Sequence, residues 1–219
     1  EDPDDEDEDG IRGVARRLMV AGQEELGRFG WKAQVPRITD FIRDAMGGEC
    51  GITTPDDGRG FAFVSDDDEV ADPELSQADI DNMTVFLQKL GPPLRGGSTD
   101  PEVAEGEVLF GTLMCDRCHI PELEGRGGQM VPLYSDLLLH DVMGPDFRGM
   151  AEPGAPSGFF KTPPLWGVVD TRPYMHDGRA STLRQAIQAH HGEALGSSTA
   201  FGLLTPPEQQ ALLAFLRDL

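Results

Sequence analysis

The sequence predicts an all-α fold, in which helical domains follow one another in tandem and long loops rich in glycine and proline join the helices. The chain has 27 Gly and 17 Pro among its 219 residues, whereas aromatic residues make up only 7%. This mixture is typical of short helices with long connections rather than of a large sheet. In addition, two segments far apart along the chain share one helical pattern.

The repeated pattern covers residues 75–90, LSQADIDNMTVFLQKL, and residues 204–219, LTPPEQQALLAFLRDL. Each segment begins with Leu and a hydroxyl residue that can cap a helix, Ser76 or Thr205, and an acid follows three positions later. Apolar residues then recur at helical spacing in both segments. We therefore expect two amphipathic helices that represent the same element used twice.

The repeat suggests two domains of unequal completeness. In residues 99–219 the pattern closes a domain that opens with a helix at 101–118 and contains a short helix, STLRQAIQAHH, capped by Ser181 or Thr182. In residues 1–95 the same pattern closes a domain that lacks a comparable beginning. We expect the first domain to be incomplete.

The motif CDRCH at residues 115–119 is the strongest chemical signal. Cys115 and Cys118 are three positions apart, so one helical turn can place both thiols where they add to the two vinyl groups of a porphyrin. His119, the next residue, would then lie under the iron as its proximal ligand. The predicted cofactor is one covalently bound haem c.

Two other chemistries fit these cysteines less well. A thioredoxin-like dithiol occurs in a βαβ setting, and no pattern of parallel strands surrounds residue 115. A zinc site needs about four nitrogen or sulfur ligands, so further ones would have to join the motif, for example Cys50 and one more histidine. Cys50 is most simply a small buried apolar residue or a stray thiol.

His190 is the predicted ligand on the other side of the iron. Three apolar residues precede it at helical spacing, Leu183, Ala186 and Ile187, so that its ring shares the apolar face of one helix. His191 is turned by about 100° from that face, towards the rim. A core histidine is the plain alternative, but the neighbouring haem anchor favours a ligand.

Residues 161–194 resemble the second haem domain of the di-haem cytochrome c peroxidase and MauG superfamily, on the pieces TPPLWGV, PYMHDGRA and STLRQAI. The chain more closely resembles the di-haem oxidoreductases once called thiol-oxidoreductase-like. That resemblance rests on LGRFGWKAQVP (26–36), GITTP (51–55), PLYSDLLLHDVMG (132–144) and HHGEA (190–194). It implies two cytochrome-c-like domains, of which residues 1–95 are the incomplete first, without a haem anchor, and residues 99–219 the haem-binding second.

The resemblance also implies roles for further side chains. Tyr174, His176 and Arg179 would line the haem pocket, with Arg179 paired to a haem propionate. Trp166 would pack near the haem edge, although a core tryptophan is an equally good interpretation. His140 matches the closer family, which gives no role for it here.

The family carries two haems, but this chain anchors only one. In the peroxidases a methionine ligand stands at the position of His190, so His/His ligation would lower the potential of this haem. Met46 lies within a residue or so of the His190 position in the repeat comparison. It could have ligated the other haem, and a core methionine is the plainer interpretation.

The chain opens on EDPDDEDEDG, in which Asp5, Asp7 and Asp9 alternate before Gly10. This is the first half of an EF-hand-type calcium loop, with Arg16 in place of the acid at position 12. A Ca²⁺ site and a solvated acidic tail both stay open.

The formal net charge of −21 makes nucleic acid a poor partner and favours a basic redox partner protein. No run of 18 apolar residues could span a membrane. No signal peptide is visible, while haem attachment implies an extracytoplasmic chain, so we expect a processed protein in a bacterial periplasm.

We predict a c-type cytochrome that transfers electrons through one six-coordinate haem. It would act as part of a di-haem oxidoreductase-like protein or of a larger redox complex with an additional haem-bearing chain. The main alternative is a peroxidase-like enzyme acting on peroxide or a protein substrate, and a third is a docking subunit whose haem is incidental.

Overall fold

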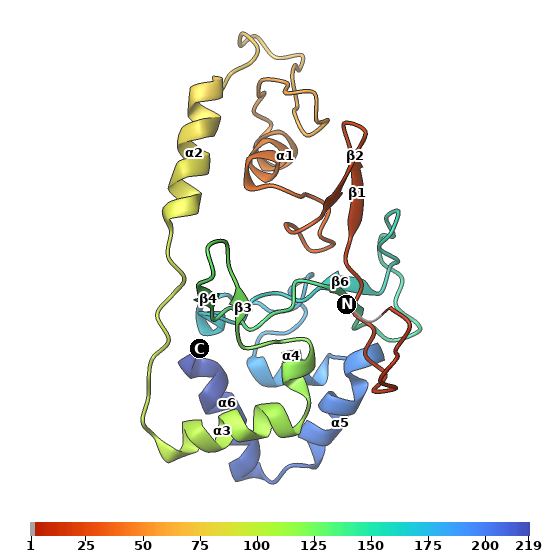
Figure 1. Cartoon of the computed structure of the whole chain (residues 1–219), viewed down its shortest axis with the longest axis vertical. Helices are drawn as coiled ribbons and strands as arrows, with labels where there is room; N and C mark the ends of the chain where they lie inside the picture. The colour runs from red at the N-terminus through yellow and green to blue at the C-terminus, as the bar shows by residue number, and fades with distance from the viewer. Residues whose placement is uncertain (1–2) are drawn as a thin grey trace. The chain divides into compact units, whose positions relative to one another are not determined.

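The computed structural model describes residues 3–219, which divide into two compact units (Figure 1). The smaller unit is Arg16–Gly91, and it contains β1 (Arg17–Val20), β2 (Gln23–Leu26), α1 (Ile38–Cys50) and α2 (Gln77–Lys89). The larger unit combines the N-terminal segment up to Ala15 with Pro92–Leu219. Its elements are α3 (Pro101–Thr112), β3 (Leu123–Glu124), β4 (Met130–Val131), β5 (Leu139–Asp141), β6 (Phe159–Lys161), α4 (Leu183–Gln188), α5 (Leu195–Leu203) and α6 (Pro206–Asp218).

The all-α prediction is wrong, because residues 3–219 also form three two-stranded antiparallel sheets, β1–β2, β3–β4 and β5–β6. Between β1 and β2 stand only Ala21 and Gly22, at φ 49° and 79°. A two-residue loop with positive φ at both positions has a backbone twist that matches the twist of the flanking strands, so it favours a β-hairpin. β5 and β6 come from opposite ends of a long Gly- and Pro-rich stretch, so local periodicity gives no sign that they pair.

The helices predicted from capping signals are present. α2 begins with a capping box formed by Ser76 and Asp79, and α6 begins with one formed by Thr205 and Glu208. α4 begins after Thr182, whose hydroxyl accepts a hydrogen bond from the first turn of the helix. In each case one side chain satisfies an amide that the helix itself cannot pair.

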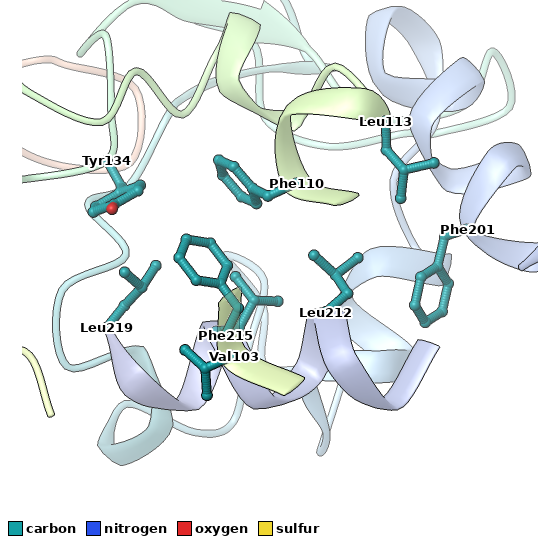
Figure 2. Packing of buried hydrophobic residues seen from close by; sticks show 9 residues of the cluster. Val103, Phe110, Leu113, Tyr134, Phe201, Leu212, Phe215 and Leu219 are labelled. Atoms are coloured by element: carbon teal, nitrogen blue, oxygen red, sulfur yellow. The ribbon is translucent and has the colours of Figure 1, made fainter. Parts of the chain in front are cut away.

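The core of the larger unit lies where α3 packs against α6. Figure 2 shows the rings of Phe110 and Phe215 next to each other between these helices. Their centroids are 5.3 Å apart and their planes are tilted by 58°. The helices come close together at Gly106, where an added Cβ would lie 2.0 Å from the carbonyl oxygen of Ala211. Since α3 leads directly into Cys115, this crossing determines where the CDRCH segment begins.

In the smaller unit α1 packs against α2. Ile80 of α2 is fully buried, and the hydroxyls of Thr39 and Thr84 lie 3.2 Å apart. No helix within residues 3–219 has both the length and the apolar character needed to cross a membrane.

Replacing Gly106 with Ala is expected to lower the free energy of unfolding by about 1–3 kcal/mol, the usual cost of overpacking a core. The added methyl group meets backbone, which cannot rotate away. Gly111→Ala is the matched control, because a Cβ there meets only the Asp116 carboxylate, at 3.4 Å. Urea unfolding of both variants measures the difference, and equal stabilities would contradict the close crossing.

Candidate haem-binding site

The CDRCH segment begins with a 3₁₀ turn, Cys115–Arg117, directly after α3. The chain enters this turn through Met114, at φ 60°, and the His119 amide donates a hydrogen bond to the Cys115 carbonyl at 2.9 Å. Both Cys115 and Cys118 are free and half-buried, and Cys115 packs against the apolar core of the larger unit. The two thiols are thus held by one short turn on a rigid helix end.

The chemistry of the thiols suits covalent attachment better than the two alternatives. Burial, with the nearby Asp116 and Cys118 adding to it, raises the pKa of Cys115 to about 12, whereas a redox dithiol depends on a low thiol pKa. Within residues 3–219, the one group of three or more His, Cys, Asp or Glu side chains close enough to share a metal ion is remote from the cysteines in sequence, at Asp5, Asp7 and Asp9. A zinc site at Cys115 therefore lacks ligands.

His119 is oriented as an iron ligand would be. Its Nδ1 lies 3.0 Å from the backbone carbonyl oxygen of Tyr134. A carbonyl can only accept, so Nδ1 carries the hydrogen and the lone pair of Nε2 is left for a metal. Burial lowers the pKa of His119 to about 4, and the charge of His190 acts in the same direction. The ring is neutral at physiological pH, which ligation requires.

His190 repeats this arrangement. Its Nδ1 lies 2.7 Å from the carbonyl oxygen of Ala186, one turn earlier, so its Nε2 is also left with a free lone pair. Burial lowers its pKa as well. His190 is half-buried and His191 exposed, as the periodicity predicted, although α4 itself ends at Gln188. That His119 and His190 ligate one iron stays a prediction.

His140, whose role the sequence left open, lies between the two sides of this site. It is buried on β5, with Nε2 2.8 Å from Asp136 Oδ2 and Nδ1 2.8 Å from Glu193 Oε2. The Cys118 sulfur lies 3.7 Å from the same Nδ1. Burial alone would lower the pKa of His140, but hydrogen bonds to Asp136, Cys118 and Glu193 raise it to about 12. His140 is therefore an imidazolium held between two carboxylates.

Glu193 ties the loop that carries His190 to β5. Its Oε1 accepts from the Asp141 amide at 3.1 Å, and its Oε2 accepts from the Arg12 amide at 3.0 Å. Burial raises the pKa of Glu193, but these bonds and the one from His140 outweigh it and lower the pKa. His140 and Glu193 thus connect the cysteine side of the site with the His190 side.

Sequence reasoning missed this network, although its members were visible. Asp136 precedes His140 by four residues in PLYSDLLLHDVMG, and Glu193 stands in HHGEA. Both pieces supported the family resemblance without suggesting a contact between them. Carboxylates on both sides of a buried histidine become evident only when β5 and the loop after α4 are brought together.

The other side chains expected to line a haem pocket have partners within the protein. The ring of His176 stacks on Phe160 of β6, with centroids 3.9 Å apart. Arg179 Nε donates to Asp177 Oδ1 at 2.9 Å, so an internal carboxylate already engages this guanidinium. A propionate contact of Arg179 stays a prediction, as does the role of His176.

Tyr174 and Trp166 both belong to the larger unit. Tyr174 lines an open pocket to which none of Cys115, Cys118, His119 or His190 contributes. Trp166 is half-buried and follows Leu165, which packs against the core. The roles proposed for both at a haem edge stay predictions.

Three further predicted residues or groups can be placed. The carboxylate oxygens of Asp5, Asp7 and Asp9 lie within 4.8 Å of one another, and calcium binding there stays a prediction. Cys50 is exposed, so it is a stray thiol rather than a small core residue. Met46 is half-buried on α1.

Replacing His140 with Gln is expected to destabilise the protein by about 3 kcal/mol or more, because two buried carboxylates lose their cation. His191→Gln, an exposed histidine in the adjoining loop, is the matched control and should be nearly neutral. Urea unfolding at pH 7 measures both.

The stability difference between the wild type and H140Q should depend on pH. In the folded protein the pKa of Glu193 is lowered from 4.5. The carboxylate therefore contributes fully to the stability of the fold above pH 4.5, and this contribution is lost as the pH falls through the pKa of the folded state. The stability difference between the wild type and H140Q should therefore narrow in that acidic range. A difference independent of pH would contradict the ionic arrangement.

The chain is similar to known proteins over most of its length. The family described as "Di-haem oxidoreductase, putative peroxidase" matches residues 4–219. None of the curated proteins matches the chain.

Several solved structures are similar, among them the following two. A MauG-like protein associated with microbial copper homeostasis is 20% identical with a TM-score of 0.56, over 88% of this chain and 69% of that one. Hydrazine synthase of Kuenenia stuttgartiensis is 23% identical with a TM-score of 0.49, over 66% of this chain, and the match spans only 56% of the hydrazine synthase chain.

The family match confirms the resemblance inferred from the residues and supports a haem-based redox function. The MauG-like structure shows a shared fold at low identity. The family match, which extends over nearly the whole sequence, decides the assignment: the chain belongs to the di-haem oxidoreductase family.

Proposed function

We propose that this chain transfers electrons through one covalently bound haem c, attached by Cys115 and Cys118 and ligated by His119 and His190. The observation that supports it is the matched orientation of the two histidines. Each donates Nδ1–H to a backbone carbonyl, at 3.0 Å for His119 and 2.7 Å for His190, and each keeps Nε2 for the iron.

Haem supplies one-electron chemistry between ferric and ferrous iron. His119 and His190 would hold the haem iron through two neutral imidazoles, and an iron held in this way would have no open position for peroxide or water. Imidazole in place of a methionine thioether lowers the potential, because the thioether favours ferrous iron. This arrangement suits electron transfer rather than peroxide reduction.

The charge of the chain fits the same function. Acidic residues outnumber Lys and Arg by 39 to 18, which favours docking of a redox partner protein with a basic surface. Covalent attachment of haem is carried out outside the cytoplasm in the systems that the family resemblance implies. We therefore propose an extracytoplasmic, periplasmic location.

Replacing His190 with Ala is expected to convert a low-spin ferric haem into a high-spin, five-coordinate one, seen in the optical and EPR spectra of the oxidised protein. H190M should restore six-coordination and raise the potential by on the order of 100 mV, given that axial ligands tune haem over about 0.8 V. His191→Ala should leave the spectrum unchanged, because that ring is exposed.

The same spectra distinguish the main alternative. A wild-type protein that is already high-spin and turns over peroxide would contradict His190 ligation and support a peroxidase-like enzyme. A low-spin wild type in which only H190A reacts with peroxide would agree with electron transfer as the native function.

The smaller unit exposes an apolar face on α2, and this face suggests where a second haem-bearing segment could bind. α2 and α6 carry the same pattern, so Phe86 corresponds to Phe215 and Leu90 to Leu219. Phe215 in α6 and Leu219 directly after it belong to the core cluster that includes Val103 and Phe110 of α3, and they are 0% and 5% exposed. Phe86 in α2 and Leu90 directly after it are 63% and 57% exposed. Within residues 3–219, the face of α2 that corresponds to the α3-binding face of α6 has no such cover.

We propose that this face of α2 binds a helix of the α3 type that precedes a second CxxCH motif, in an additional haem-bearing segment or partner chain. The internal comparison supports this occupant, since within the larger unit an α3-type helix is what covers the corresponding face. Burying Phe86 and Leu90 would remove about 150 Å² or more of apolar surface from water, a substantial contribution to such an interface.

Replacing Phe86 with Glu is expected to abolish association with that haem-bearing species, because a charge would enter an apolar contact. The tagged protein is isolated from its source cells, and bound species are scored for covalent haem by haem-stained gel. Met19→Glu is the control, since Met19 is 72% exposed elsewhere in the smaller unit. Retention of the second haem species by F86E would contradict the proposal.

A further inference from the structure

Three arginines meet at an open pocket of about 380 Å³ in the larger unit. Arg217 comes from the last turn of α6, Arg184 from α4, and Arg172 from the loop before α4. Tyr174 and Gln210 add neutral polar groups to the walls. Among the lining residues in the described part of the chain there is no carboxylate.

The pocket lies on the side of α6 that faces away from α3. Gln210, Leu213 and Arg217 stand at i, i+3 and i+7 and so share one stripe of the helix. At 100° per residue, this stripe is turned by well over 90° from the one that includes Phe215 and Leu219 and packs on α3. None of the predicted haem anchors and iron ligands, Cys115, Cys118, His119 and His190, lines the pocket, although Tyr174 does.

The charge of the pocket is unusual for this chain. With 39 acidic residues and 18 Lys and Arg, an arginine readily finds a carboxylate, as Arg95 does with Asp218 at 2.8 Å. Arg172 and Arg217 have no such partner within residues 3–219. Asp218, the sequence neighbour of Arg217, is directed instead to Arg95 and to the Ser98 amide.

The third arginine is held in place by neutral groups. Arg184 Nη1 donates to the side-chain oxygen of Gln209, and its guanidinium lies 5.4 Å from the centre of the Phe201 ring. Both contacts fix its position without neutralising its charge. Three positive charges thus converge on one concave surface without an internal counterion.

We propose that this pocket binds a small polyanion that carries two or more carboxylate or phosphate groups. Guanidinium groups recognise both kinds of anion through paired hydrogen bonds. The hydroxyl of Tyr174 and the amide of Gln210 supply neutral donors, and Leu213 provides an apolar floor. The volume falls within the range of small-molecule sites, about 300–1,000 Å³. The proposal does not depend on how the haem iron is ligated.

Isothermal titration of the haem-loaded full chain with pyrophosphate and with citrate, at constant ionic strength, tests the proposal. Saturable one-to-one binding tighter than about 1 mM is expected for at least one of them. Arg172→Gln and Arg217→Gln should each weaken it about tenfold by removing a charged donor. Both side chains are exposed, so the variants should fold normally.

Arg126→Gln is the matched control, because it removes one exposed charge from the β3–β4 turn of the same unit. Its affinity should equal that of the wild type, and equal weakening in all three variants would show a general charge effect and overturn the proposal. Absence of saturable binding would also overturn it. If inorganic phosphate bound as tightly as either polyanion, the pocket would recognise a single anionic group, and the polyanion assignment would fail.

Discussion

The close crossing of α3 and α6 is the constraint on which the larger unit depends. Gly106 removes the side chain that would separate the helices, and Phe110 and Phe215 then fill the space beside it. α3 ends at Thr112 and the haem-attachment turn begins at Cys115, so an error in the crossing would displace the cysteines. The other face of α6 is left to form the wall of the arginine pocket.

Local signals explain what could be predicted from sequence. The capping boxes at Ser76 and Thr205 depend on residues within one turn, and both are present. The β1–β2 hairpin was also local, with Gly22 in its turn, but the low aromatic content and helical repeats favoured an all-α interpretation. β5 pairs with β6 and, through Leu139, with Val14, and no local pattern could reveal partners so distant in sequence.

The candidate site divides in the same way. CDRCH is contiguous, and the inward direction of His190 follows from helical periodicity, so both could be identified from the sequence. The carbonyls of Tyr134 and Ala186 that orient the two histidines are backbone atoms and carry no sequence signature. The ionic group of His140, Asp136 and Glu193 needed β5 and the loop after α4 to be assembled first.

The N-terminal segment has a consequence for the order of folding. Val14 exchanges backbone hydrogen bonds with Leu139, and the Arg12 amide binds Glu193. These contacts join the segment up to Ala15 to residues far along the sequence, so this segment can take its place only after those residues have folded nearby. Closing so long a loop costs entropy before any contact compensates for it. The larger unit should therefore fold slowly, because the segment up to Ala15 must find Pro92–Leu219. The smaller unit, Arg16–Gly91, can form its internal contacts before that happens.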